Sequence, residues 1–164
     1  MDELWVLDAS PLIVLARIGR LDLLSETCKT VLIPEAVITE IARGPSDDPA
    51  RQALESGWSK KSISVEPDSE ILEWGLGAGE TAVLTLARHR HGRAVVDDRA
   101  ARTACSAFGI RHIGTLGIIL RAKQRGKIPS SVEVLRELVE AGFRLDDRTI
   151  HAVLKETTGE KWPE

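Results

Sequence analysis

The stretch LWVLDASPLIVLAR, residues 4–17, joins an apolar run to a second apolar segment through an acid and a Ser-Pro pair. The run LWVL is typical of a buried strand that ends at Asp8. Ser10 and Pro11 then indicate a helix start, with Ser10 as the cap and the helix continuing to Arg17. A strand followed directly by a helix is the repeating unit of parallel sheets, so this stretch predicts an α/β fold.

The alternation of strand and helix continues along the chain. We expect further strands at residues 30–34, 63–67, 94–97 and 111–114, with helical segments between them at 34–44, 47–57, 68–74, from Glu80 onward, at 98–109 and at 115–125. This order predicts a three-layer α/β/α domain with a central parallel sheet of four to five strands over residues 1–128. Two further helical segments, 130–142 and 146–159, predict a C-terminal helical hairpin within residues 129–164, packed on the domain or appended to it.

Length and composition fit a soluble chain with its own core. The 164 residues are 43% hydrophobic and 29% charged, no apolar run approaches the roughly 18 residues of a membrane span, and the N-terminus lacks a signal-peptide pattern. We therefore expect a cytoplasmic protein that does not enter a membrane. Cys28 and Cys105 are far apart and have apolar neighbours, so we expect core thiols and no zinc site.

The net charge of −3 hides an uneven distribution. Residues 88–127 contain ten basic side chains and two acids, Asp97 and Asp98, whereas the remainder is acidic. A local excess of positive charge can attract a polyanion, and Arg99 and Arg102 are the candidate substrate-binding residues in this basic segment. The alternative is a set of solvated helix faces. Aromatic residues do not alternate with the basic ones, so the segment does not predict base stacking.

The stretch GLGAGETAVLTLA, residues 75–87, has the appearance of a phosphate-binding loop but lacks its requirements. Glu80 stands where a dinucleotide fingerprint needs its third glycine, and no Lys-Ser/Thr pair follows as in a P-loop. The stretch instead predicts a turn that starts a helix and places Glu80 in the first turn, on the stripe of Val83, Leu84 and Ala87. Such an acid can simply complement the helix dipole, so a functional role depends on partners elsewhere.

Other acids are expected at the same place. Asp8 follows the first strand, and Asp97 and Asp98 follow the strand AVV, so all three should lie at the carboxyl edge of a parallel sheet. Glu40 belongs to the helix after TVLIP, beside an apolar stripe, and could join them together with Glu80. Each acid also has a structural alternative: Asp8 as a turn residue, Glu40 as a surface acid, and Asp97 or Asp98 as a helix cap.

Acids gathered without basic partners repel one another, and a bound cation is the usual way to hold them. Oxygen ligands favour Mg²⁺ or Mn²⁺ over zinc, and such ions support hydrolysis of phosphodiesters, with one metal or with two. The five carboxylates therefore predict a divalent metal site.

In their order, five stretches resemble the PIN domain, the metal-dependent nuclease fold of VapC-type toxins: VLDASPLIVLARIG, VLIPEAVITEIARG, GLGAGETAVLTLA, VVDDRAAR and GTLGIILRAKQRG. The resemblance spans residues 4–125 and implies a ribonuclease that cleaves RNA by metal-activated water with Mg²⁺ or Mn²⁺. It also implies the toxin of a toxin–antitoxin pair, with a protein antitoxin, and a homodimer. A small upstream gene for a DNA-binding protein would support that pairing.

The resemblance also assigns site residues. It implies catalytic roles for Asp8, Glu40, Glu80 and Asp98, and a metal-ligand set of Asp8, Glu40, Glu80, Asp97 and Asp98. Ser10 matches a small hydroxyl residue that orients the phosphate or a water. Two departures from the family pattern are that Glu80 replaces an Asp and that Val96-Asp97-Asp98 replaces Thr/Ser-x-Asp, which leaves either Asp97 or Asp98 as the ligand. The alternative functions are a catalytically inactive PIN-like module that binds RNA or a partner, and a phosphatase for small esters.

Overall fold

The computed structural model describes residues 3–58 and 62–163, and within them the strands form one parallel sheet. Its five strands have the order β3-β2-β1-β4-β5. They are β1 (Leu4–Leu7), β2 (Thr30–Pro34), β3 (Ser62–Ile63), β4 (Arg93–Val95) and β5 (His112–Ile113). A strand is found at each of the five predicted places, but β3 contains only Ile63 of the predicted residues 63–67. Residues 1, 2, 59–61 and 164 of the predicted domains lie outside the described residues.

Helices connect consecutive strands and follow the last one. Two helices lie between β1 and β2, two between β2 and β3, two between β3 and β4, and one between β4 and β5. In chain order they are α1 (Ala9–Arg17), α2 (Asp22–Thr27), α3 (Glu35–Ala42), α4 (Pro49–Glu55), α5 (Ser69–Leu72), α6 (Ala78–Arg90) and α7 (Arg99–Ala107), followed after β5 by α8 (Thr115–Gln124), α9 (Ser131–Glu140) and α10 (Asp147–Thr157). Of these, α2 was not predicted from the sequence.

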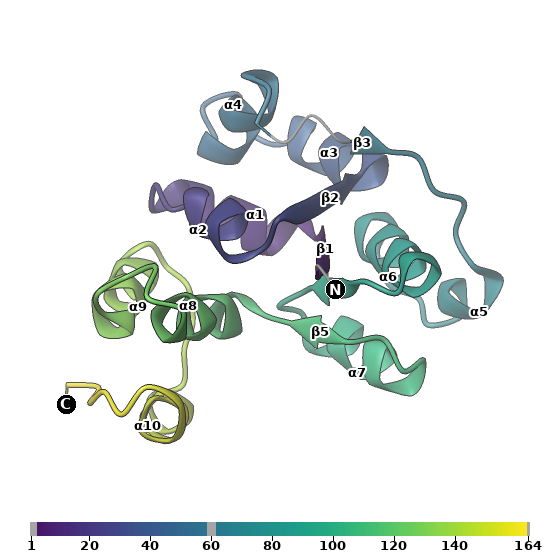
Figure 1. The fold of residues 1–164 in the computed structure, drawn as a ribbon. Coiled ribbons are helices and arrows are strands. Elements are labelled where there is room, and N and C mark those ends of the chain that lie inside the picture. Colours follow the sequence, from purple (N-terminus) through teal and green to yellow (C-terminus); the bar gives the residue numbers. More distant parts are fainter. Residues whose placement is uncertain (1–2, 59–61, 164) are drawn as a thin grey trace.

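The helices cover both faces of the sheet, which confirms the three-layer α/β/α prediction. Figure 1 shows α6 on one side of the strands and α1, α2 and α8 on the other. Trp5, Val6 and Leu7 of the central strand β1 are completely buried, as expected for a parallel strand covered on both faces. Cys28 and Cys105 are buried free thiols, as predicted. No described helix is long and apolar enough to cross a membrane.

The expected cap of the first helix was wrong. Helix α1 begins at Ala9, two residues earlier than predicted, and Asp8 occupies the N-cap position without a side-chain capping hydrogen bond. Pro11 falls within the first turn, where the missing N–H of proline costs no helical hydrogen bond. Ser10 is consequently an exposed residue of the first turn, and the carboxylate of Asp8 is left free of a capping role.

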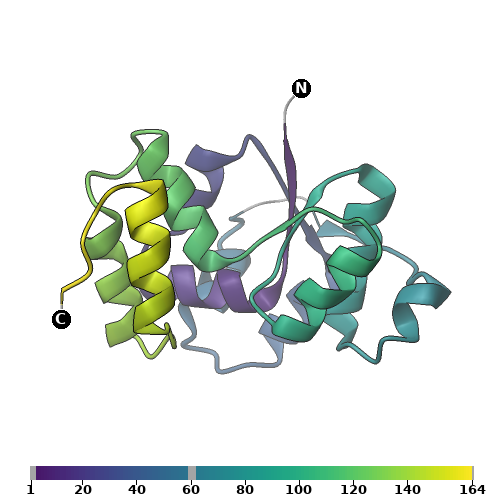
Figure 2. The ribbon, with the colours of Figure 1, turned by 90° about the horizontal axis from the view of Figure 1, so that it is seen from below.

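The C-terminal segment forms the predicted pair of helices, and they lie against the rest of the chain. Figure 2 shows α8, α9 and α10 side by side at one end of the molecule. Leu135 and Leu138 of α9 are completely buried and belong to the same apolar core as the sheet. The Arg20 guanidinium donates two hydrogen bonds of 3.0 and 2.9 Å to the Glu137 carboxylate. Helix α9 is therefore joined to the region after α1 by apolar and ionic contacts.

These shared contacts predict that the extension and the sheet unfold together. We expect Leu138→Ala to lower the free energy of unfolding by about 2–5 kcal/mol, because it leaves a cavity in the common core. Urea unfolding followed by far-UV circular dichroism and by tryptophan fluorescence should show a single transition at a lower midpoint. Two separate transitions, with the sheet transition unchanged, would show that the extension folds independently.

Candidate metal centre

The strand order creates a crevice at the carboxyl ends of β1 and β4. From β1 the chain continues to β2 and β3 on one side, and it then crosses to β4 and β5 on the other side. Leu7 is paired with Val95, and the Asp8 N–H donates a 3.1 Å hydrogen bond to the Val95 carbonyl. Ligands of open parallel sheets bind where the strand order reverses in this way. Asp8 and Asp97 follow the two strands that flank this switch point.

Asp8 is a buried acid among other acids. Its side chain is buried, with 4% of the residue exposed, and no basic side chain in the described part of the chain forms an ion pair with it. Burial raises the pKa of Asp8 to about 7; the backbone N–H of Ala9 opposes this, and the charges of Glu80, Glu40 and Asp97 add to it. A carboxyl group with such a perturbed pKa in a crevice is typical of a functional site.

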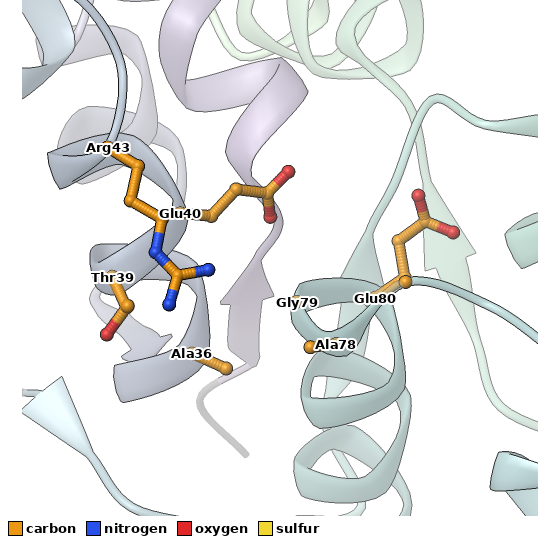
Figure 3. Close-up of a pocket in the computed structure, with 8 residues that line it drawn as sticks. Ala36, Thr39, Glu40, Arg43, Ala78, Gly79 and Glu80 are labelled. Atoms are coloured by element: carbon orange, nitrogen blue, oxygen red, sulfur yellow. The ribbon is translucent and has the colours of Figure 1, made fainter.

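Glu40 and Glu80 reach the same region from two facing helices. They line a pocket of about 360 Å³ between α3 and α6, together with Arg43 and Gly79. Figure 3 shows Glu40 and Arg43 extending from α3 toward the gap between the helices, whereas Glu80 projects from the first turn of α6 on the side away from α3. Burial raises the pKa of Glu80, and the charges of Asp98 and Glu40 raise it further. The structure therefore brings Glu80 close to two of the other predicted site acids.

The position of Gly79 gives a physical reason for one of the glycines that precede Glu80. A Cβ atom on Gly79 would lie 2.5 Å from Glu40 Oε2 and 3.6 Å from Asp8 Oδ1. The first of these distances is too short for a real contact, so any larger residue would displace the Glu40 carboxylate. Both acids therefore approach α6 where it carries no side chain. The stretch around Gly79 therefore places an acid at position 80 and, through the glycine at position 79, leaves room for the carboxylates of Glu40 and Asp8.

Asp97 and Asp98 occupy different positions at this edge. Asp98 caps α7, with Oδ2 accepting a 3.0 Å hydrogen bond from the Ala101 N–H. Asp97 accepts hydrogen bonds from the backbone N–H and the hydroxyl of Thr115, at 2.7 and 2.6 Å. Asp97 acts electrostatically on Asp8, whereas Asp98 acts on Glu80. Both acids therefore have structural partners, and both add negative charge to the site.

The predicted substrate-binding residues lie beside this edge in different ways. Exposed Ser10 lines a pocket of about 280 Å³ together with Glu40. Arg102 lines a larger pocket of about 510 Å³ together with Asp97. Arg99 is exposed at the start of α7 and lines neither of these two pockets.

Several other residues of the basic segment bind acids of the chain. Arg93 and Arg121 contact Glu3 at 2.5 and 2.8 Å, and Arg88 pairs with Asp68 at 3.6 Å. The excess of positive charge counted along the sequence is therefore partly used in structural ion pairs, and only some of it is available to a ligand.

Two further residues near the acids were not singled out from the sequence. Arg43 lies three residues after Glu40 on α3, a spacing that places both on one helix face and could have indicated it. Phe143 belongs to the C-terminal segment yet lines both the pocket of Ser10 and the pocket of Arg102. No local pattern connects Phe143 to this edge, because the hairpin is placed there by tertiary packing.

The residues present fit a hard divalent cation. All five acids offer oxygen ligands, which Mg²⁺ and Mn²⁺ prefer, and Asp8 is a buried carboxylate without a basic partner among the described residues. In the described residues no three of these side chains already form a closed ligand set. The long side chains of Glu40 and Glu80 are the ones whose rotation can complete it, since Asp97 and Asp98 are held by hydrogen bonds.

The Asp8 carboxyl should make the stability of the metal-free protein depend on pH. Its pKa is about 7 in the folded protein against an ordinary value of 3.8, so its contribution to stability is complete below pH 4 and is lost as the pH rises through 7. Relative to the wild type, Asp8→Asn should gain about 3 kcal/mol in unfolding free energy between pH 5 and pH 8. Urea unfolding in EDTA measures this difference, and a difference that does not change with pH would contradict the assignment.

Comparisons with known proteins agree with this fold. A family model described as a PIN domain matches residues 4–159. Among solved structures, PAE2754 from Pyrobaculum aerophilum is similar, with a TM-score of 0.52 and 19% sequence identity over 75% of this chain and 99% of that chain. At this identity the likeness concerns the fold alone. No curated protein sequence matches the chain. Since the family model spans almost all of the sequence, the chain belongs to the PIN-domain family.

Proposed function

We propose that this PIN-domain protein is a metal-dependent ribonuclease that hydrolyses RNA phosphodiester bonds with Mg²⁺ or Mn²⁺. The observation that carries the proposal is the gathering of acids around buried Asp8, which no described basic residue pairs with, at the switch point of the sheet. PIN domains have a nuclease-like fold, so the family supports the same class of reaction. The toxin role and the protein antitoxin rest on the resemblance to VapC-type toxins alone.

In this proposal several acids coordinate the cation together. Asp8, Glu40, Glu80 and Asp98 are the proposed ligands, with Asp97 as the alternative to Asp98. A divalent cation bound there supplies activation of water and neutralises charge on the phosphodiester. The hydrogen bonds from Thr115 fix the Asp97 carboxylate, and the Asp98 carboxylate is fixed by α7. Asp97 and Asp98 are thus held by hydrogen bonds after β4, whereas Glu40 on α3 and Glu80 on α6 can rotate.

The remaining polar residues can position the RNA backbone. The exposed Ser10 hydroxyl, two residues after Asp8, can donate a hydrogen bond to a phosphate oxygen. Arg102 shares a pocket with Asp97, and Arg43 shares one with Glu40 and Glu80, so each guanidinium lies beside a proposed ligand. Contacts of this type bind phosphates regardless of base sequence. Arg99 is proposed to add charge for the same purpose.

Cleavage of RNA by the purified protein tests the proposal. The wild type should cleave a mixed panel of single-stranded RNAs with Mn²⁺ or Mg²⁺ and not with EDTA, and Asp8→Asn should lower the rate about 100-fold or more. Asp22→Asn removes a charge from exposed Asp22 at the start of α2 and is the matched control, with an unchanged rate. Binding of RNA without cleavage by the wild type would favour the inactive binding module. Equal rates for Asp8→Asn and the wild type would remove these acids from catalysis.

Gly79 allows the site to be disturbed without harming the fold. Gly79→Ala should leave the melting temperature of the metal-free protein unchanged or raised, because alanine is favoured in a helix by about 1 kcal/mol. It should reduce both the Mn²⁺-induced rise in melting temperature and the cleavage rate, because the added methyl displaces Glu40. The control is Gly77→Ala, where a Cβ meets nothing within 4 Å and the response to Mn²⁺ should persist. An undiminished Mn²⁺ response in Gly79→Ala would contradict the claim that the ion needs the Glu40 carboxylate in its present position beside Gly79.

A further inference from the structure

The loop between α9 and α10 lies beside the candidate metal centre, although it comes from the far end of the sequence. Residues 141–143 line the pocket that contains Ser10 and Glu40. Residues 143–146 line the adjoining pocket that contains Asp97 and Arg102. Each pocket therefore combines a proposed metal ligand with a wall supplied by this loop.

Phe143 is the residue that the two pockets share. The side chain is half-buried, and its backbone N–H donates a 2.9 Å hydrogen bond to the Leu138 carbonyl at the end of α9. Gly142 before it has a φ of +96°, which turns the chain sharply after the helix. The position of Phe143 is thus fixed by the helix end.

The side chain of Phe143 packs against the apolar core and is half-buried, so a ligand in either pocket can reach only part of it. The other phenylalanine of the chain, Phe108, packs against Trp74 with ring centroids 6.0 Å apart and carries the Arg88 guanidinium over its face. In the described residues Phe143 has no such aromatic or cationic neighbour. An aromatic face beside a phosphate-cleaving site is suited to stacking on an unpaired base.

Positive charge accompanies the ring on one side. Arg144 is exposed, lines the pocket of about 510 Å³ together with Arg102, and forms no ion pair within the described part of the chain. The neighbouring acid, Asp146, is occupied as the cap of α10, where it accepts hydrogen bonds from the Thr149 N–H and hydroxyl. The pocket thus offers two guanidinium groups beside the hydrogen-bonded carboxylates of Asp97 and Asp146, and its volume is in the range of small-molecule sites.

We propose that the loop 141–146 forms part of the RNA-binding surface: Phe143 stacks on a base next to the scissile phosphate, and Arg144 with Arg102 binds the neighbouring phosphate. This inference rests on the proposed ribonuclease function and adds the residues that hold the RNA beside the site. A base can stack on Phe143 only where it is not paired, so this contact requires an unpaired nucleotide. In a duplex the bases are enclosed, and only backbone contacts would remain.

Binding can be separated from cleavage by using Asp8→Asn as the parent protein. Fluorescence anisotropy with a short labelled single-stranded RNA gives the Kd of the parent and of variants made in it. We expect Phe143→Leu to weaken binding roughly tenfold through loss of stacking, and Phe143→Trp to retain it. Arg144→Ala should weaken binding and lower the slope of log Kd against log salt by about 1. Arg148→Ala removes an equal charge from exposed Arg148 on α10, outside both pockets, and should bind like the parent.

The possible results distinguish this inference from the proposed function. If wild-type protein cleaves RNA while Phe143→Leu and Arg144→Ala bind as tightly as the parent, the loop inference is overturned and the ribonuclease assignment stands. If no protein of the series binds or cleaves RNA, the ribonuclease assignment fails and the inference fails with it. The melting temperature of each variant shows whether it is folded. If Phe143→Leu is unstable, the Kd values of Phe143→Trp and of Arg144→Ala, which changes an exposed residue, test the inference instead.

Discussion

The parallel pairing of β1 with β4 fixes the place where this protein can carry out chemistry. It joins the first strand of the chain to a strand almost ninety residues later and leaves the ends of both open, with Asp8 after one and Asp97 after the other. Helix α6, which leads into β4, packs against α3 and brings Glu80 to Glu40. Without this pairing the five acids would have no common edge, and the adjoining pockets would not form.

The acids at this edge repel one another, so their positions are unfavourable electrostatically. Burial and the neighbouring charges of Glu80, Glu40 and Asp97 disfavour ionised Asp8, and no ion pair with a basic side chain in the described residues relieves this. The surrounding structure must offset the cost, and the fully buried side chains of β1 and β4 provide the apolar packing that does so. A cost of this kind, concentrated at a crevice, is typical of a site shaped for a ligand and not for stability.

The sequence was informative where local pattern determines position. Asp8, Asp97 and Asp98 could be placed at one edge because they follow strands β1 and β4, which are apolar runs, whereas the prediction for β3 overlapped the strand at Ile63 alone. The strand order was not predictable, because it depends on which strands pair across long separations. Helix α2 and the early start of α1 at Ala9 were missed, since short helices and caps carry weak signals. The approach of Glu40 to Gly79, and of Phe143 to Arg102, exists only through tertiary packing.

The central claim is that these acids hold a divalent cation, and anomalous diffraction tests it most directly. Crystals soaked in Mn²⁺ and measured on both sides of the manganese absorption edge show the position of the ion without reference to activity. The account predicts an anomalous peak at the carboxyl ends of β1 and β4, with a carboxylate oxygen of Asp8 among its ligands and Glu40 or Glu80 rotated toward it. No peak at this edge in crystals grown near neutral pH, or a peak ligated by other residues alone, would contradict it.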